Sequence, residues 1–161
     1  MTSWTVRPAT PAEIARIARV WFDGWHEAHA HLVPPDLTAL RTLESFAERL
    51  HPMLDDIRVV GAAGAPVGFC ALKGDELYQM FVSREARGSG AAAALMADAE
   101  ARLAAAGVTT AWLACAIGND RAARFYEKSG WRRAATITYH AETPTGVLPL
   151  DVWRYEKSLT G

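Results

Sequence analysis

The sequence predicts an α/β protein of the α+β kind, in which a mixed, mostly antiparallel central sheet of about six to seven strands is flanked by about four helices. Three observations predict this fold. Short β-rich runs follow one another in the middle of the chain, as in hairpins. Helical patterns then alternate with strands, as in crossover connections. The 161 residues, half of them hydrophobic, suffice for one core, so we expect a single domain over residues 1–161.

The first third of the chain predicts a short strand followed by two helices. Thr10 before Pro11 is typical of a helix start, and apolar residues then recur at spacings of three and four up to Trp25. Two prolines interrupt the pattern and predict a loop. The expected bounds are residues 4–7 for the strand, 11–25 and 37–50 for the helices, and 26–36 for the loop.

Turn residues divide the rest of the chain into strands and two further helices. Ala-rich helical periodicity ends at Gly107, and Gly130 is typical of a left-handed helix cap. Pro149 lacks an N–H group, so its end of the last strand is expected at a sheet edge or a bulge. The expected strands cover residues 57–60, 67–72, 76–82, 110–116, 131–141 and 147–157, and the expected helices cover 88–107 and 119–129.

The composition excludes several classes of partner. Seventeen basic and eighteen acidic residues give a net charge of −1, which argues against a broad surface for nucleic acid or for an anionic membrane. No signal peptide and no membrane span are expected. Cys70 and Cys115 form no CxxC pair, which suits a reducing compartment, so we expect a cytoplasmic protein. Any anionic ligand must be bound locally.

A glycine-rich turn between a strand and a helix is the best candidate for such a local site. Gly88 and Gly90 let the backbone approach a ligand closely, and the first turn of the helix offers unpaired N–H groups and a positive dipole end. Arg87 and Arg84 add charge. The turn lacks both the dinucleotide and the NTPase fingerprint. The alternative is a turn that only lets a helix start tightly.

Two motifs make the chain resemble the GNAT superfamily of acyl-CoA-dependent N-acyltransferases. Arg87, Gly90 and Ala92 fit the pattern [Q/R]-x-x-G-x-[G/A] after a strand that ends in Val82. The segment GNDRAARFYEKSGWRR fits a second family element, N-x-x-A-x-x-F-Y-x-x-x-G-[F/W]. Arg84 departs from the proline that is usual in the family. The resemblance implies the GNAT fold and acetyl-CoA as the acyl donor, with no metal.

The resemblance also implies which residues hold the coenzyme. Backbone amides of the glycine-rich turn would bind its pyrophosphate, and the strand before the turn would pair with the pantetheine arm. Asn119 would contact the pantetheine, although capping of its own helix explains this residue equally well. The residues implied are Met80, Phe81, Val82, Arg87, Gly88, Ser89, Gly90, Ala91, Ala92, Asn119 and Tyr126.

Tyr126 and Glu76 are the candidate catalytic residues. Tyr126 stands at the family's general-acid position, and a phenol can protonate a departing thiolate; the alternative is an aromatic residue packed beside Phe125. Glu76 lies eleven residues before Arg87, as does the base of the histone-acetylating branch. A base role requires a raised pKa or a water relay. The alternative is a polar residue that starts a strand.

The segment from Trp21 to Asp36 is the expected wall of the acceptor pocket. Its carboxylates Asp23, Glu27 and Asp36 would attract a cationic amine, and Trp25 would offer an aromatic face. Three histidines in this segment lack the spread of ligands typical of a zinc site, so no metal is expected. Trp112, Tyr139 and Trp153 are interpreted as packing residues. The expected acceptor-binding residues are Trp25, His26 and His29.

These expectations combine into one hypothesis of function. The protein would transfer the acetyl group of acetyl-CoA to a primary amine of a small molecule by direct attack, because neither cysteine has an activating motif partner. Two alternatives stay open: a protein lysine or N-terminal acetyltransferase, and a non-catalytic acyl-CoA-binding module. A closed aromatic pocket would favour the small amine, and a wide acidic groove a peptide. A homodimer is expected by analogy only.

Overall fold

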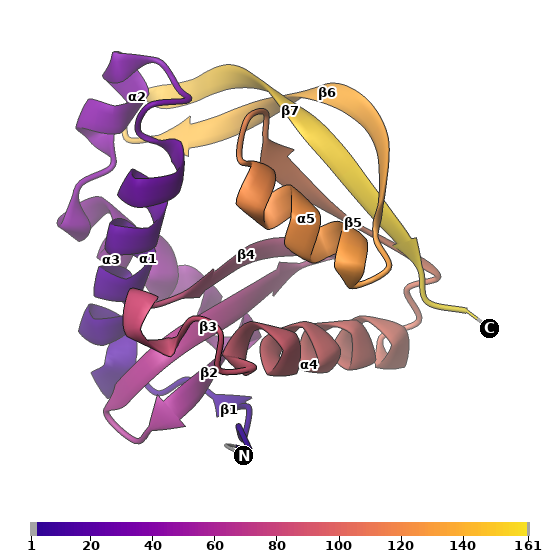
Figure 1. Ribbon diagram of the computed structural model, residues 1–161. Coiled ribbons are helices and arrows are strands. Elements are labelled where there is room, and N and C mark those ends of the chain that lie inside the picture. Colours follow the sequence, from indigo (N-terminus) through magenta and orange to yellow (C-terminus); the bar gives the residue numbers. More distant parts are fainter. Residues whose placement is uncertain (1–2, 161) are drawn as a thin grey trace.

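The computed structural model describes residues 3–160, which form a seven-stranded mixed sheet with helices on both faces (Figure 1). The strand order is β1-β2-β3-β4-β5-β7-β6, and β4 and β5 are the parallel neighbours. The predicted α/β fold is confirmed. The strands are β1 (Arg7–Pro8), β2 (Ile57–Ala62), β3 (Ala65–Lys73), β4 (Glu76–Val82), β5 (Thr110–Ala116), β6 (Arg132–Thr143) and β7 (Gly146–Ser158). The helices are α1 (Ile14–His29), α2 (Pro35–Leu40), α3 (Leu43–Leu50), α4 (Ala91–Ala105) and α5 (Asp120–Lys128).

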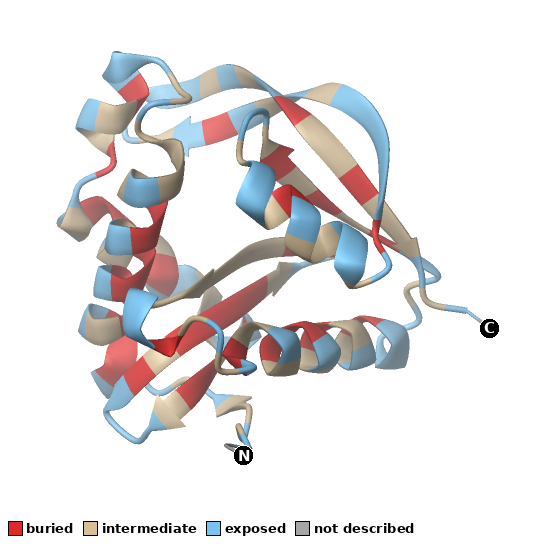
Figure 2. Ribbon diagram, in the orientation of Figure 1, coloured by how far each residue is buried: buried red, intermediate tan, exposed pale blue. Residues whose placement is uncertain are grey.

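The two faces of the sheet carry separate hydrophobic cores, as the buried inner sides of the helices in Figure 2 show. On one face, α1 and α3 pack on the sheet around Trp21 and Phe46, whose rings lie 4.6 Å apart. On the other face, α4 and α5 pack on the sheet around Leu95 of α4 and Tyr155 of β7. Gly24 permits the close approach of α1 to β4, because a Cβ atom there would lie 2.5 Å from the Phe81 ring.

A buried carboxylate fixes the start of the first helix. Glu13 is 1% exposed and receives a bidentate pair from Arg7 at 3.0 and 2.7 Å. The backbone N–H groups of Thr10 and Gly64 also donate to Glu13, each at 3.0 Å. These bonds, that of Arg7 above all, lower the pKa of Glu13 to about 2. The network ties β1, the start of α1 and the β2–β3 turn together.

Strands β4 and β5 separate soon after they meet. Their only register pair is Glu76 with Trp112, and the Trp112 N–H group bonds to the Asp75 carbonyl at 3.2 Å. Figure 1 shows the two strands diverging from this point, with α5 beside the opening. On its other side β4 stays paired with β3 as far as Val82. The diverging edge of β4 therefore keeps backbone groups that β5 does not bind.

Several element boundaries differ from the prediction. The helix predicted over 88–107 covers only Ala91–Ala105, because Gly88 and Gly90 take left-handed backbone angles in the turn before it. Three further differences lie in the first third of the chain. The first strand covers Arg7–Pro8 rather than residues 4–7, because it is defined by pairing with β2. Helix α1 continues beyond Trp25 to His29, and the loop starts one turn later than predicted. The helix predicted over 37–50 is two helices, since Arg41 leaves the helical conformation and the Thr42 side chain accepts from the Ser45 N–H to start α3.

The first part of β7, which contains Pro149, lies outside the pairing with β5, in agreement with the position at a sheet edge that Pro149 predicts. β7 pairs with β5 from Val152 onward, and before that residue it pairs with β6 alone. Pro149 faces His140 of β6 in a stretch that β5 does not reach, so its missing N–H group interrupts no bond to β5. Among residues 3–160, no helix has the length and apolar character needed to cross a membrane.

Candidate active site

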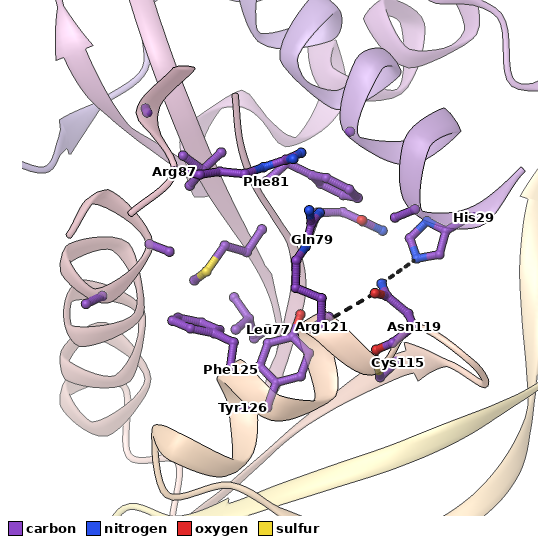
Figure 3. A pocket seen from close by; sticks show the side chains of 18 of the residues that line it. His29, Leu77, Gln79, Phe81, Arg87, Cys115, Asn119, Arg121, Phe125 and Tyr126 are labelled. Carbon is purple, nitrogen blue, oxygen red and sulfur yellow. Dashed lines mark hydrogen bonds between the residues drawn. The ribbon is translucent and has the colours of Figure 1, made fainter. Parts of the chain in front are cut away.

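A cavity of about 430 Å³ opens where β4 and β5 separate, and α1, α5 and the N-terminus of α4 complete its walls (Figure 3). The β4 wall consists of residues 77–82. Of the residues predicted to bind the coenzyme, Ser89 and Ala91 lie outside the lining: Ser89 Oγ bonds to the Ala86 carbonyl, and Ala91 is buried in the core. Those that line the cavity are Met80, Phe81, Val82, Arg87, Gly88, Gly90, Ala92, Asn119 and Tyr126.

The glycine-rich turn is shaped for a close approach to its backbone. Gly88 and Gly90 have φ angles of +73° and +90°, in the left-handed region that favours glycine. A Cβ atom on either residue would meet no protein atom within 4 Å, so both face open space. α4 begins directly after Gly90, and the first helical N–H groups have no acceptor within the helix. Trp4 Nε1 donates to the Ser89 carbonyl at 3.0 Å and braces the turn.

The arginines of this turn bind a carboxylate of α1. Arg87 donates to both oxygens of Glu27, at 2.9 and 2.8 Å. Arg84 and Arg121 lie 3.2 and 3.6 Å from the same carboxylate. The Arg87 hydrogen bond holds the pKa of Glu27 at about 2. Glu27 therefore ties α1 to the turn and to α5, and the prediction that it attracts a cationic amine is wrong.

The other carboxylates predicted for the acceptor site also lie elsewhere. Asp23 forms an exposed pair with Arg19 along α1 at 3.3 Å. Asp36 is exposed in the first turn of α2. Neither residue lines this cavity.

Asn119 caps α5 and also faces the cavity. Its Oδ1 accepts from the Ala122 N–H group at 3.4 Å, as the capping interpretation predicts. Its Nδ2 lies 3.4 Å from Nε2 of His29, as drawn in Figure 3. Burial lowers the pKa of His29 to about 4, so this imidazole is neutral at pH 7.

Tyr126 lies on α5 at the wall of the cavity, beside Phe125 and close to Cys115. Its ring packs against Tyr155 at a centroid distance of 5.9 Å. Burial raises the pKa of Tyr126 above its usual range, so the phenol stays protonated at neutral pH. Burial likewise raises the pKa of the Cys115 thiol to about 12.

Glu76 is buried at the point where β4 meets β5, with 6% of its surface exposed. Burial raises the pKa of Glu76 to about 7. The Tyr139 hydroxyl donates to Oε2 of Glu76 at 3.2 Å and acts in the opposite direction, because it favours the charged form. Tyr139, which the sequence pattern assigns to packing, is thus a direct partner of the candidate base.

A second cavity of about 150 Å³ adjoins the first, and both are lined by His29, Tyr78, Gln79 and Ala114. Tyr78 is the extra residue of a β-bulge, since Ala71 pairs with Gln79 and Leu72 pairs with Leu77. The second cavity is mainly aromatic and apolar. Its aromatic lining residues are Trp21, Trp25, Tyr78 and Tyr139.

The residues predicted to bind the acceptor separate into two groups. Trp25 and His29 line the second cavity, although Trp25 is also a core residue, 8% exposed, that packs on Phe46. His26 does not reach either cavity: its Nε2 lies 2.7 Å from the Arg41 carbonyl and its ring packs on Phe22 at 4.3 Å. His26 therefore holds α1 against the α2–α3 junction. Over residues 3–160, no three His, Cys, Asp or Glu side chains are grouped to hold a metal ion.

Comparison with known proteins identifies the family. The family model described as Acetyltransferase (GNAT) family matches residues 14–131, well over half of the chain. The chain therefore belongs to the GNAT acetyltransferase family. It is an acyl-CoA-dependent N-acetyltransferase, with acetyl-CoA as cosubstrate. Comparison with the curated proteins gives no match.

Solved structures share the fold over nearly the whole chain. The PaiA N-acetyltransferase of Thermoplasma acidophilum in complex with coenzyme A is 17% identical, with a TM-score of 0.77, and the match covers 98% of this chain and 99% of that one. An N-acetyltransferase of Staphylococcus aureus Mu50 is 18% identical, with a TM-score of 0.74 and coverage of 99% and 100%. The ribosomal-protein-alanine N-acetyltransferase of Brucella melitensis is 18% identical, with a TM-score of 0.69 and coverage of 96% and 99%.

Proposed function

We propose that the enzyme acetylates a primary amine of a small molecule by direct attack in a ternary complex. The observation that carries this proposal is a compact aromatic cavity that adjoins the larger cavity and has Tyr139, the partner of Glu76, in its wall. The larger cavity would hold acetyl-CoA, which supplies the acetyl group as a thioester. The smaller cavity would hold the acceptor.

The larger cavity fits the coenzyme in three respects. Gly88 and Gly90 present backbone that no Cβ atom shields, and the N-terminus of α4 favours an anion such as a pyrophosphate. The diverging edge of β4 offers backbone groups to an extended arm, in the manner of an added strand. Asn119 adds an amide on the opposite wall.

Glu76 would take the proton that the acceptor must lose. An alkylammonium group has a pKa of about 10.4, so formation of the free amine at pH 7 costs roughly 4 to 5 kcal/mol. A carboxylate with a pKa of about 7 is a far better base than an ordinary glutamate. Because Glu76 is buried behind Tyr139, we infer that a water molecule beside the Tyr139 hydroxyl relays the proton.

Tyr126 would supply the proton for the leaving group. The amine nitrogen forms a bond to the acetyl carbon, the carbon–sulfur bond breaks, and the nitrogen loses its extra proton to solvent to give the amide. The Tyr126 hydroxyl protonates the departing sulfur and regains a proton from solvent. The raised pKa of Tyr126 keeps this proton available at neutral pH. Cys115 lines the same cavity, but its thiol has a pKa of about 12 and is a poor nucleophile, which supports direct attack over an acyl-cysteine.

The size of the smaller cavity favours a small acceptor over a protein. A volume of about 150 Å³ with an aromatic lining matches a small amine better than a peptide. Its charged lining residues are largely basic, whereas a groove for a lysine-rich peptide would be acidic.

The proposal is tested by thermal shift with acetyl-CoA, followed by measurement of thiol release across a panel of small amines and lysine peptides. We expect stabilisation by acetyl-CoA and turnover with small amines. Glu76→Gln should lower kcat by about 100-fold and remove the pH dependence near 7, since general bases contribute about 10² to 10⁴. Glu44→Gln, an exposed residue of α3, is the matched control. Stabilisation without turnover would indicate a binding module, and turnover with peptides alone would contradict the small acceptor.

A further inference from the structure

Two arginines from the α2–α3 region line the acceptor-side cavity without a full set of partners. Arg41 is 4% exposed, and its buried Nε has no hydrogen-bond partner. Arg49 also has a buried Nε without a partner. Buried donors are nearly always satisfied, and an unpaired one costs about 1 to 3 kcal/mol. Among residues 3–160, each guanidinium makes one side-chain hydrogen bond, from Arg41 Nη1 to the Glu142 carbonyl and from Arg49 Nη2 to the Tyr78 hydroxyl, so both keep Nη donors for a ligand.

No carboxylate of the described residues forms an ion pair with either arginine. Among residues 3–160, neither Arg41 nor Arg49 has a carboxylate within salt-bridge distance. The nearby Glu142 offers Arg41 its backbone carbonyl, at 2.7 Å, while its carboxylate pairs with Lys73 at 3.4 Å. Burial and the charge of Arg49 together lower the pKa of Arg41 to about 10, which leaves it charged at pH 7.

Both guanidinium groups are held in place by the protein. Arg49 stacks on Trp21 at 4.5 Å and donates to the Tyr78 hydroxyl at 2.9 Å. Arg41 is anchored by its bond to the carbonyl of Glu142 in β6 and by the break between α2 and α3. A rigid, partly desolvated pair of guanidinium groups binds a planar anion more strongly than mobile surface lysines do.

We propose that the acceptor is an amine that also carries a carboxylate, and that Arg41 and Arg49 bind this carboxylate. This inference rests on the proposed function, in which the smaller cavity holds the acceptor. The carboxylate would lie at the Arg41 and Arg49 end. The amine would lie toward Tyr139, beside which a water molecule would relay its proton to Glu76.

The cavity has the charge pattern that such a molecule requires. A compact amino acid has an anion and a cation a few ångströms apart, and its carboxylate offers two coplanar oxygens to a guanidinium fork. A simple alkylamine would leave the buried Arg41 and the half-buried Arg49 without a counter-charge, which is costly. The site therefore disfavours amines that lack an anionic group, because their binding would leave the arginine charges unpaired.

The test compares matched amines that differ in the carboxylate. The pairs are β-alanine and ethylamine, L-lysine and cadaverine, and L-phenylalanine and phenethylamine, with L-phenylalanine methyl ester as a further neutral analogue. We expect kcat/KM by thiol release to be at least about tenfold higher for the carboxylated members, as charge-assisted hydrogen bonds predict. Calorimetric binding of the same compounds in the presence of CoA gives the preference without turnover.

Substitutions test whether the two arginines cause the preference for carboxylated amines. Arg49→Gln should reduce the carboxylate preference to about one, and Arg49→Lys should restore part of it, because the charge returns without the fork. Arg132→Gln, whose side chain is 70% exposed in β6, is the control and should keep the preference. Arg41→Gln is compared by binding and by thermal unfolding, since it also loses the bond to β6.

The outcomes separate the inference from the proposed function. Equal kcat/KM and equal binding within the pairs would overturn the inference, although transfer to any small amine would still support the proposed function. A preference for taurine over β-alanine would show that the site recognises a sulfonate-like anion and would contradict the carboxylate. Carboxylate-dependent binding without transfer to any amine would retain the site and refute the proposed acceptor chemistry.

Discussion

The hydroxyl of Tyr139 donates a hydrogen bond of 3.2 Å to the buried carboxylate of Glu76. The two residues are 63 positions apart and lie on β6 and β4, which are not neighbours in the sheet. Tyr139 also lines the smaller cavity, which is the proposed acceptor site. The hydrogen bond gives the candidate base a fixed orientation and moderates the rise in its pKa that burial causes.

Tyr139→Phe is expected to move the pH dependence of the enzyme upward. Burial raises the folded-state pKa of Glu76 to about 7, so kcat should increase with pH as the carboxylate loses its proton near that value. Without the Tyr139 hydroxyl the charged form loses a donor, and the apparent pKa rises further. The measurement is kcat against pH from 5.5 to 9 at saturating substrates.

Activity of the Tyr139→Phe variant should recover at high pH, because Glu76 remains present. A shift of the rise in kcat to lower pH, or an unchanged dependence of kcat on pH, would contradict the role of Glu76 as the group that titrates. Thr138→Val serves as the control, since Thr138 is an exposed neighbour on β6 that bonds to Asp151.

Tyr126→Phe is expected to lower kcat by about 10- to 100-fold, at the low end of general-acid effects because water can also protonate a thiolate. The phenyl ring keeps the packing against Phe125 and Tyr155, so stability should change little. Acetyl-CoA affinity, measured by calorimetry, should stay within about twofold. Because the pKa of Tyr126 is raised, the wild-type profile should show no loss of activity from this group below pH 10. Unaltered kcat in the variant would exclude Tyr126 as the acid.

Gly90→Ala should weaken acetyl-CoA binding by about tenfold or more, since a methyl group would stand between ligand and backbone at a left-handed position. Gly107→Ala is a close control. Gly107 follows the other end of α4, has a φ of +89° against +90° for Gly90, and also faces open space. Both variants should lose about 1 kcal/mol of stability from backbone strain. Equal coenzyme affinity in the two variants would remove the turn from the binding site.

Glu13 should make the fold sensitive to acid. Its folded-state pKa of about 2 lies below the value of 4.5 for the unfolded chain, so its contribution is complete above pH 4.5 and is lost as the pH falls toward 2. The difference between the two pKa values sets an upper limit of roughly 3 kcal/mol on the contribution of Glu13 to the free energy of unfolding.

Glu13→Gln should therefore cost about 2 kcal/mol in urea unfolding at pH 7 and less at pH 3, where the carboxylate of the unfolded chain is mostly protonated although the folded one is still mostly charged. Glu44→Gln, exposed on α3, should unfold like the wild type at both values. A stability gap that stays constant between pH 7 and pH 3 would refute the assignment.

Local signals predicted the elements that form the larger cavity. The bounds of β4 and β5 agree with the predicted 76–82 and 110–116, because alternating apolar residues and adjacent turns mark both ends. Gly90 and Asn119 act at helix starts, which depend only on nearby residues. The break before α3 was missed, although Thr42 followed by Ser45 three residues later is a recognisable N-cap signal.

The proposed acceptor site was harder to predict because it is assembled from distant parts of the chain. Arg41, Arg49 and Tyr139 meet only when β6 folds back toward α1 and α3, and nothing in their neighbours along the sequence announces this. Tyr139 did lie on the inward face of a predicted strand, in alternation with Ala141. A pattern of that kind identifies an inward residue, but the partner it faces depends on tertiary structure.

The separation of β4 and β5 couples the stability of the folded chain to binding of the coenzyme. An unpaired strand edge is usually an aggregation hazard, and here one lies inside the sheet, where the coenzyme is proposed to act as the missing strand. A ligand that binds only the folded chain shifts folding by mass action. The folded fraction, and with it resistance to proteolysis, should therefore follow the supply of acetyl-CoA, so that the metabolite would serve the enzyme as a chaperone as well as a substrate.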